Sequence, residues 1–427
     1  MNELRFDINS LLGQKTDCDC GKVHTCNMEK VLIRNGALNE LPALCKNYKS
    51  IAIVCDKNTR RVCGERVLEL LADKVTSSLT FECDGFVVPD EDAVARINSI
   101  VSDSTDLLVG VGSGVINDLC KYVSFEHGLP YYIVATAPSM DGYASKGCAM
   151  IFGGMKVTTN ANPPTAIIAD TSVIKDAPLE MLKAGYGDII GKYSCLNDWR
   201  LSNVVNGEPV CKYIYDLTYD TVTSIAGKGK DILSRDEQSI AELMHALVLV
   251  GIAMAYMGNS RPASGSEHHL SHYYEVVGLL RNEPYFCHGI DVAYSTYETA
   301  KIREQLLKIE KPEGVEFNES LWEQELIRVY GKDNDRTTAD GIIALQKKLG
   351  WIYEDKMPVY VEKWDEIRKL LSESPSPREV MNMLESIELP ISDYEATYSE
   401  KKRADALLYA KDLKDRYSVL WLYSQIK

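Results

Sequence analysis

The sequence predicts an α/β N-terminal domain built on a parallel sheet, followed by an all-α C-terminal domain. Through the first 170 or so residues, short apolar runs rich in β-branched residues alternate with segments of helical spacing, as in helix-covered parallel sheets. After about residue 175, long helical patterns dominate and β-branched runs become scarce. The length of 427 residues suits two domains. We therefore predict an α/β domain over residues 1–175 and a helical domain over residues 176–427.

The expected elements of the first domain follow from hydrophobic periodicity. Short apolar runs predict strands, and apolar residues spaced by threes and fours predict helices. The expected strands cover residues 50–55, 80–83 with 86–88, 106–111, 131–135 and 166–169. The expected helices cover residues 61–72 and 90–102.

The second half contains longer periodic segments. Helices are expected over residues 240–257, 294–308 and 405–425. The longest apolar run, residues 246–256, has too few residues to span a bilayer. We therefore expect no membrane insertion.

Composition narrows the class of protein. A net charge of −15 argues against binding to nucleic acid or to an anionic membrane. The first ten residues lack the apolar segment of a signal peptide. The twelve cysteines are scattered, and several lie in apolar runs, so we expect them to be reduced core thiols. Together these features indicate a cytoplasmic protein.

A glycine-containing turn follows one of the expected strands. The strand over residues 106–111 runs directly into G-S-G-V-I-N-D (112–118), which then opens a helix. Glycines allow backbone N–H groups to approach a phosphate, and the helix N-terminus favours negative charge. Val115 departs from the G-x-G-x-x-G pattern, so the turn could also serve only to reverse the chain. Its position between strand and helix favours nucleotide binding.

Two further polar positions follow expected strands. Asp56 ends the first strand of this unit, where a carboxylate can bind an adenosine ribose and repel a 2′-phosphate. An Asx-turn or a helix cap explains Asp56 equally well. The loop T-A-P-S-M-D-G (136–142) follows another strand, and its Thr136, Ser139 and Asp141 could contact a ligand or simply form a turn.

Four of the seven histidines fall within 21 residues, in S-G-S-E-H-H-L-S-H (264–272) and F-C-H-G (286–289). His268 and His272 are four residues apart and therefore share one face of a helix. Pro262, Ser264 and Gly265 suit the start of that helix. Two histidines and one carboxylate leave a coordination position open for substrate, and Asp188, in A-G-Y-G-D-I-I-G-K (184–192), could supply the carboxylate. Capping of a helix start is the alternative explanation for Asp188.

A second group of potential ligands lies near the N-terminus. Cys18, Cys20, His24 and Cys26 occur in C-D-C-G-K-V-H-T-C. Thiolates and imidazole bind zinc, but this spacing is not a usual zinc-finger pattern. We favour the alternative, a tight turn at Gly21 between two short strands, with the cysteines acting as small apolar residues.

Five separated motifs together resemble one family, the sn-glycerol-1-phosphate dehydrogenases, and particularly their bacterial branch. This family belongs to the iron-containing alcohol dehydrogenase and dehydroquinate synthase-like superfamily. The resemblance covers about residue 50 to residue 290 and rests on V-G-S-G-V-I-N-D, T-A-P-S-M-D-G-Y-A-S, A-G-Y-G-D-I-I-G-K, S-R-P-A-S-G-S-E-H-H-L-S-H and C-H-G.

The resemblance implies a Rossmann-like nucleotide-binding domain, a helical domain and an active site in the cleft between them. It implies that Asp188, His268 and His288 bind a metal ion. His272 and Asp141 match substrate-contacting, catalytic positions. The positions matching those that hold a nicotinamide cofactor are Asp56, Gly114, Val115, Ile116, Asn117, Asp118, Thr136, Ala137, Pro138, Ser139 and Ser145.

The implied reaction is the reversible reduction of dihydroxyacetone phosphate to sn-glycerol 1-phosphate with NAD(H) or NADP(H). Zinc is the first choice of divalent metal, with nickel or iron possible, and a homo-oligomer is expected. Lys156, Lys192 and Arg261 are candidate cations for the substrate phosphate. The alternatives are another polyol dehydrogenase such as a glycerol dehydrogenase, a dehydroquinate synthase-like cyclase, and a binding protein that has lost turnover.

Overall fold

The structure is a computed structural model that describes residues 7–427 except 83, 84, 86 and 154. It contains two compact units. The first consists of Met1–Gly185 with Thr223–Ser260, and the second of Tyr186–Val222 with Arg261–Lys427. The domain boundary expected between residues 175 and 176 remains a prediction. The expected fold class is confirmed, because a parallel sheet lies in the N-terminal part and helices make up the C-terminal part.

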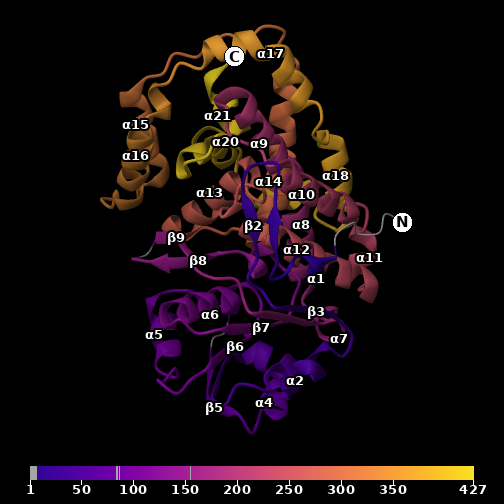
Figure 1. Ribbon diagram of the computed structural model, residues 1–427. Coiled ribbons are helices and arrows are strands. Elements are labelled where there is room, and N and C mark those ends of the chain that lie inside the picture. The colour runs from indigo at the N-terminus through magenta and orange to yellow at the C-terminus, as the bar shows by residue number, and fades with distance from the viewer. Residues whose placement is uncertain (1–6, 83–84, 86, 154) are drawn as a thin grey trace. The chain divides into compact units, whose positions relative to one another are not determined.

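Six parallel strands form the central sheet of the first unit, in the order β3-β10-β7-β6-β4-β5 (Figure 1). The chain leaves β4 toward β5 on one side and leaves β6 toward β7 on the other, so the strand order reverses between β4 and β6. Ligands of open α/β sheets bind at the carboxyl ends of strands at such a reversal. The strands are β3 (Lys30–Arg34), β4 (Ile51–Asp56), β5 (Val75–Phe81), β6 (Leu107–Gly112), β7 (Tyr131–Ala135) and β10 (Ala166–Asp170).

Helices cover both faces of this sheet (Figure 1). Ile53 and Val109 pack on one face with Leu41 of α2 and Val67 of α4. On the other face lies α6, which contacts β4, β6 and β7. The sheet is therefore buried on both sides, which explains why its central strands are nearly continuous apolar runs. The helices of this unit are α1 (Ile8–Leu11), α2 (Leu41–Leu44), α3 (Lys57–Thr59), α4 (Glu65–Leu70), α5 (Glu91–Asn98), α6 (Gly114–His127), α7 (Thr171–Ile174), α11 (Gly229–Leu233) and α12 (Glu237–Met257).

Several expected boundaries need correction. The strand expected over residues 80–83 and 86–88 is β5, which begins at Val75 and ends at Phe81. Residues 83 and 86 lie outside the described part of the chain. The helix expected over residues 61–72 begins with a π-helical turn, Arg60–Gly64, and continues as α4.

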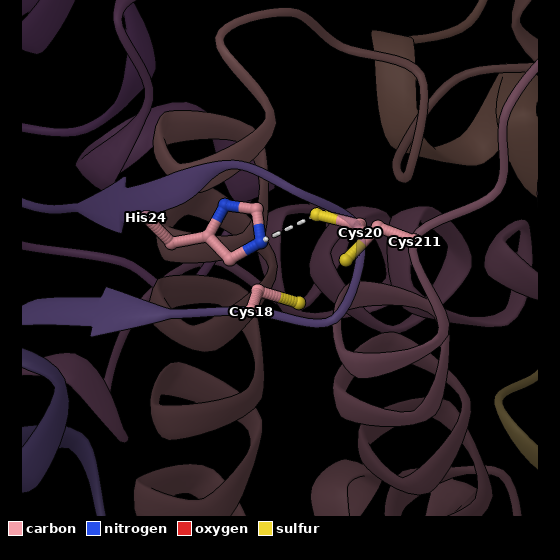
Figure 2. A group of neighbouring side chains, drawn as sticks. All are labelled: Cys18, Cys20, His24 and Cys211. Atoms are coloured by element: carbon pink, nitrogen blue, oxygen red, sulfur yellow. Dashed lines mark hydrogen bonds between the residues drawn. The ribbon is translucent and has the colours of Figure 1, made fainter.

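Two antiparallel hairpins lie outside the central sheet, one before β3 in the sequence and the other between β7 and β10. β1 (Lys15–Asp17) pairs antiparallel with β2 (Val23–Thr25) (Figure 2). Gly21, in the turn between them, has a φ of 80°. The expected turn between two short strands is therefore confirmed. β8 (Gly147–Phe152) pairs antiparallel with β9 (Met155–Asn160).

The helix α12 is longer than the apolar run seen in the sequence. By length and composition it could cross a membrane, with a mean hydropathy of 1.8 over its most apolar window. However, 78% of that window is buried inside the structure. It is therefore explained as a core helix, and its apolar composition reflects burial on all sides.

The second unit is helical, and among its described residues no strand occurs. The prediction of a single helix over residues 405–425 is wrong. The chain instead forms α20 (Glu400–Tyr409), a 3₁₀ turn over Ala410–Leu413, an irregular segment, and α21 (Val419–Gln425). Two helices, α8 (Leu179–Ile190) and α10 (Lys212–Ile225), each begin in one unit and end in the other. The helices of the second unit are α9 (Lys192–Asn206), α13 (Ser266–Arg281), α14 (His288–Leu307), α15 (Glu319–Tyr330), α16 (Thr337–Leu349), α17 (Met357–Leu371), α18 (Pro377–Ser386), α19 (Ile391–Thr397), α20 (Glu400–Tyr409) and α21 (Val419–Gln425).

Candidate metal centre and nucleotide-binding site

Three expected metal ligands come together in the second unit. One ligand atom from each of Asp188, His268 and His288 lies within 4.8 Å of the others. Asp188 and His268 are buried, and His288 is partly exposed. One carboxylate and two imidazoles suit zinc, nickel or iron and leave positions open for a substrate. The donor set therefore fits a divalent ion.

The local fold brings these ligands from three helices. His268 lies in the first turn of α13, which begins after Gly265 as expected, and His288 is the first residue of α14. Asp188 is placed differently from the expectation. It lies inside α8 and not at a helix start, so the capping explanation is wrong for this residue.

A glycine beside Asp188 permits the close packing of these helices. A Cβ atom on Gly187 would lie 2.3 Å from the carbonyl oxygen of Gly289 and 2.8 Å from Cβ of Ala293. No side chain fits at that separation, so α8 and the start of α14 are in backbone contact at this point. Since Gly289 directly follows His288, the same contact sets the position of two ligands relative to each other.

Electrostatics keep the site ready for a cation. Lys192 is fully buried and donates hydrogen bonds from Nζ to Asp188 Oδ1 at 2.8 Å and to the carbonyl oxygen of Ala263 at 3.0 Å. Burial opposes ionisation of Asp188, but neighbouring positive charge, above all that of Lys192, outweighs it and lowers the pKa of Asp188 to about 2. Burial, followed by the charge of Lys192, lowers the pKa of His268 well below its usual value. The ligands are thus an anionic carboxylate and a neutral imidazole, the forms that bind metals.

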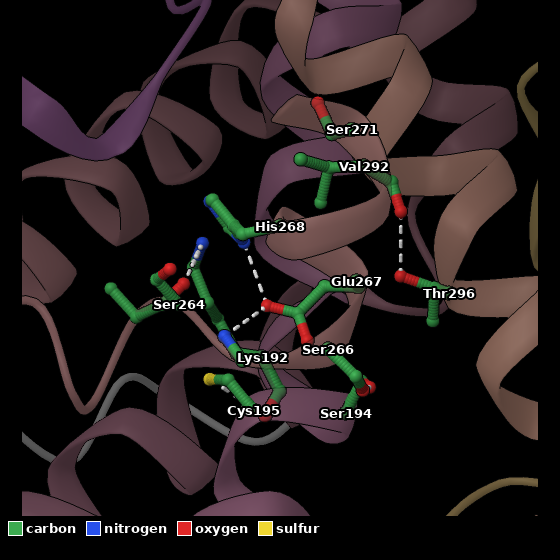
Figure 3. A network of polar contacts seen from close by, with 12 residues as sticks. Lys192, Ser194, Cys195, Ser264, Ser266, Glu267, His268, Ser271, Val292 and Thr296 are labelled. Carbon is green, nitrogen blue, oxygen red and sulfur yellow. Dashed lines mark hydrogen bonds and ion pairs between the residues drawn. The ribbon is translucent and has the colours of Figure 1, made fainter. Parts of the chain in front are cut away.

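Glu267 orients one of the ligands (Figure 3). Its Oε1 lies 2.7 Å from Nδ1 of His268 and also accepts a hydrogen bond from the Gly265 N–H at 2.8 Å. This contact leaves Nε2 of His268 facing Asp188 Oδ1, at 3.5 Å. Glu267 is not evident as a functional residue from the sequence, because adjacent residues on a helix normally point in different directions. Its position immediately before His268 was the only available signal.

The other two histidines of the cluster differ in position. The ring centroid of His272 lies 6.3 Å from that of His268 and 5.5 Å from that of His288, so His272 borders the ligand set. His269 is fully buried, and burial lowers its pKa well below the usual value. It does not belong to the group of potential ligands.

Two of the three candidate cations for the substrate phosphate are already engaged. Lys192 pairs with Asp188, and Arg261 is 2% exposed and donates to Glu208 Oε2 at 2.8 Å. Lys192 therefore neutralises a buried carboxylate, and Arg261 neutralises the partly exposed carboxylate of Glu208. The third, Lys156, belongs to β9, and its side chain lies outside the described part of the chain.

The glycine-containing turn of the first unit leads into α6 as expected. A Cβ atom on Gly112 would lie 2.6 Å from the side chain of Ile116, so the end of β6 touches the helix directly. Ser113 precedes the helix but makes no capping hydrogen bond with its side chain. The first-turn N–H groups of α6 are thus not capped by that side chain, which fits binding of a phosphate. The helix starts with the expected cofactor positions Gly114, Val115, Ile116, Asn117 and Asp118.

Asp56 caps a helix. Its Oδ1 accepts hydrogen bonds from the N–H groups of Asn58 at 2.7 Å and Thr59 at 2.9 Å, and Thr59 completes a capping box. The capping explanation is therefore confirmed. Asp56 also ends β4, next to β6 and its glycine turn, so the ribose-binding role remains a prediction.

The loop after β7 is held by Lys121, a residue that no sequence motif marks as functional. Lys121 of α6 is fully buried and donates to the carbonyl oxygens of Gly142 at 2.7 Å and Gly147 at 3.0 Å. It also donates to Oγ of Ser145 at 3.1 Å. Lys121 therefore fixes the segment that contains Ser145 and follows the buried Asp141. The loop itself carries Thr136, Ala137, Pro138 and Ser139, and Tyr143 donates its hydroxyl hydrogen to the carbonyl oxygen of Ala137 at 2.6 Å.

The fold of the chain is similar to the folds of solved alcohol and glycerol dehydrogenases. The structure matches an alcohol dehydrogenase from an archaeal halo-thermophile of a Red Sea brine pool with a TM-score of 0.59 at 12% identity, covering 94% of this chain and 98% of that one. It matches glycerol dehydrogenase from Schizosaccharomyces pombe with a TM-score of 0.54 at 17% identity, covering 95% and 96%. At these identities the matches show the fold alone.

Sequence comparison gives the family. Residues 32–178 match the family described as iron-containing alcohol dehydrogenase. The glycerol-1-phosphate dehydrogenase [NAD(P)+] of Bacillus licheniformis is 31% identical over 100% of this chain and 95% of its own length. That of Geobacillus stearothermophilus is 36% identical over 69% of this chain and 74% of its own length. The chain therefore belongs to the glycerol-1-phosphate dehydrogenase [NAD(P)+] family, within the iron-containing alcohol dehydrogenases.

Proposed function

We propose that this protein catalyses the reversible, metal-dependent reduction of dihydroxyacetone phosphate to sn-glycerol 1-phosphate with NADH or NADPH. The observation that carries the proposal is the convergence of Asp188, His268 and His288 in a chain that aligns over its whole length with a glycerol-1-phosphate dehydrogenase. A binding protein that had lost turnover would not need to keep this ligand set.

The proposed metal site uses residues of the second unit. Asp188, His268 and His288 would hold the ion, Glu267 would orient His268, and Lys192 would keep Asp188 ionised. When bound, the ion supplies Lewis-acid polarisation of the C2 carbonyl. Zinc is the first choice for two imidazoles and a carboxylate, with nickel and iron as alternatives.

The chain's own residues then have two tasks. His272, beside two of the ligand imidazoles, would give a proton to the C2 oxygen as hydride reaches C2, and would accept it in the reverse reaction. Asp141 would orient the substrate. Both roles require that the ketone be held in line with the nicotinamide and shielded from water.

The proposed cofactor site belongs to the first unit. The uncapped start of α6, over residues 114–118, would bind the pyrophosphate, and the loop of residues 136–139 with Ser145 would contact the nicotinamide half. Asp56, at the end of β4, would contact the adenosine ribose. Both NADH and NADPH are proposed cofactors, with NADH preferred because of the charge of Asp56.

The direct test is the loss of NADH absorbance with dihydroxyacetone phosphate, with dihydroxyacetone, or with neither. Protein stripped of metal and reloaded with zinc, nickel or iron is assayed in parallel. The proposal expects turnover with the phosphorylated ketone only, and only after reloading. Faster turnover with dihydroxyacetone would instead favour a glycerol dehydrogenase, and no turnover with either ketone would contradict the proposal.

We also propose that the protein is cytoplasmic and forms a homo-oligomer of two or more copies. None of the described cysteines forms a disulfide, which is usual for a reducing compartment. The homo-oligomer rests on the family resemblance. Light scattering of the purified protein measures its mass, and a mass near the 47.7 kDa of one chain would contradict an oligomer.

A further inference from the structure

The N-terminal hairpin carries three potential metal ligands that the proposed reaction does not use. Cys18 follows β1, Cys20 lies in the turn, and His24 lies in β2 (Figure 2). The two Sγ atoms and a ring nitrogen of His24 lie within 4.8 Å of one another. His24 is fully buried, Cys18 partly buried and Cys20 exposed. Cys20 is therefore not a small core residue, as the turn explanation had expected. Figure 2 also labels Cys211, which belongs to the second unit.

The spacing of the donor atoms suits a tetrahedral ion. Sγ of Cys20 lies 3.4 Å from Nε2 of His24. Zinc bonds of about 2.3 Å to sulfur and about 2.1 Å to nitrogen, at the tetrahedral angle, place these two atoms about 3.6 Å apart. The described atoms therefore already lie near the separation that zinc would impose.

Contacts with Tyr256 fix the orientation of the His24 ring. Its Nδ1 lies 3.1 Å from the carbonyl oxygen of Tyr256, and its ring stacks on the ring of Tyr256 at 5.6 Å with an angle of 17° between the planes. Tyr256 is fixed in turn, because its hydroxyl donates to the carbonyl oxygen of Leu11 at 2.8 Å. A hydrogen bond from Nδ1 to a carbonyl oxygen places the free electron pair on Nε2, which faces Cys20. Metal-binding histidines are usually held in this way.

Cys26 differs from the two hairpin cysteines, although it lies only two residues after His24. It is fully buried. It does not belong to the group of potential ligands. Cys26 is therefore the matched control for any substitution in the hairpin.

We propose that Cys18, Cys20 and His24 bind a zinc ion, separate from the metal of the reaction. Two thiolates and one imidazole select zinc over harder ions such as magnesium. The ion would link the turn of the hairpin to His24. The ring of His24 in turn contacts Tyr256, near the end of α12. Water or a further side chain would complete the tetrahedron. The role is structural, since these residues hold no proposed substrate or cofactor contact.

The test measures zinc per chain in five forms of the purified full-length protein. We expect about two zinc ions per chain in the unaltered protein and about one in Cys20→Ser. His288→Ala, which lacks only a ligand of the proposed reaction site, should also keep about one. The double variant should keep almost none, and Cys26→Ala should resemble the unaltered protein.

Cobalt substitution of the unaltered protein provides a second measurement that does not depend on how the variants fold. Thiolate ligands give cobalt a charge-transfer band in the near ultraviolet, and the Asp188, His268 and His288 set contains no thiolate. We expect this band in the unaltered protein and in His288→Ala, and its loss in Cys20→Ser. Cobalt-loaded protein without the band, or zinc that His288→Ala loses completely, would overturn the proposal. Failure of the proposed reaction would leave these outcomes unchanged, so the two proposals fail independently.

Discussion

At the scale of single residues, Glu267 gives the clearest prediction, because it touches a proposed ligand and not the substrate. Its carboxylate fixes which nitrogen of His268 faces Asp188. Glu267→Ala should weaken zinc affinity about tenfold to a hundredfold, the usual effect of removing such a partner. Competition with a chromogenic chelator measures this affinity. Glu275→Ala, on the same helix, is the control, and equal affinities in the two variants would contradict the role of Glu267.

The three histidines of α13 should divide their roles. His268→Ala should lose the metal. His272→Ala should keep the metal but lower kcat/KM by about a hundredfold or more, the scale for loss of an acid–base group. His269→Ala should keep metal and turnover but lower stability by on the order of 2 kcal/mol, because it empties a buried site. Metal analysis, kinetics and thermal unfolding of all three variants test this. Loss of metal in His269→Ala alone would show that the assignment is wrong.

Asp56 caps helix α3 and is also proposed to repel the 2′-phosphate of NADPH. One substitution separates these two roles. Asp56→Ser removes the carboxylate but keeps an oxygen that can cap α3. The ratio of kcat/KM with NADH to kcat/KM with NADPH should therefore fall by about tenfold. This is the factor expected for the loss of one hydrogen bond to a charged group. Thr59→Val, which removes the other half of the capping box, should not change the preference. An unchanged ratio of kcat/KM values in Asp56→Ser would limit Asp56 to capping.

At the scale of elements, the backbone contact of α8 with α14 predicts a linked loss of stability and metal binding. Gly187→Ala places a Cβ atom where Gly289 already lies, so the helices must separate. We expect a loss of about 1–3 kcal/mol in unfolding free energy and weaker zinc binding, because Asp188 and His288 move apart. Denaturant unfolding and chelator competition measure both quantities.

The control for Gly187 is the same substitution in an open position. Gly341 lies inside α16, and no atom lies within 4 Å of the position that its Cβ would occupy. Gly341→Ala should therefore raise stability by about 0.5–1 kcal/mol, because alanine favours helices, and should leave zinc affinity unchanged. Equal effects of the two substitutions would contradict the importance of the α8 contact.

Strands and helices could be predicted from the sequence where burial makes the pattern of apolar residues regular. The strands β4, β6, β7 and β10 are nearly uniformly buried, so their apolar runs stand out. The start of β5 was missed because V-T-S-S-L-T-F mixes polar residues with apolar ones at the edge of the sheet. The break before α21 was also missed, since apolar spacing continues across it. A tertiary contact sets the start of α21, because the N–H of Val419 donates a hydrogen bond to the buried Asp198 at 2.9 Å.

At the scale of the whole molecule, the two units carry different parts of the proposed chemistry. The grouping of Asp188, His268 and His288, the proposed metal ligands, was predictable because His268 has a helical neighbour at His272 and the motifs resemble a known family. The supporting contacts of Glu267, Lys192 and Lys121 were not, because no regular residue pattern marks them. Glu267 directly precedes His268, Lys192 lies four residues after Asp188, and Lys121 donates to backbone carbonyl oxygens. Sequence patterns identify ligands more readily than the residues that position them.

The central claim is metal-dependent reduction of dihydroxyacetone phosphate at Asp188, His268 and His288, and the configuration of the product tests it most directly. Metal-loaded protein is incubated with NADH and dihydroxyacetone phosphate, and the product is offered to an enzyme that oxidises only sn-glycerol 3-phosphate. We predict that NADH is consumed, that the product resists this oxidation, and that chelation or His288→Ala abolishes its formation. A product that is fully oxidised, or undiminished formation after chelation, would contradict the account.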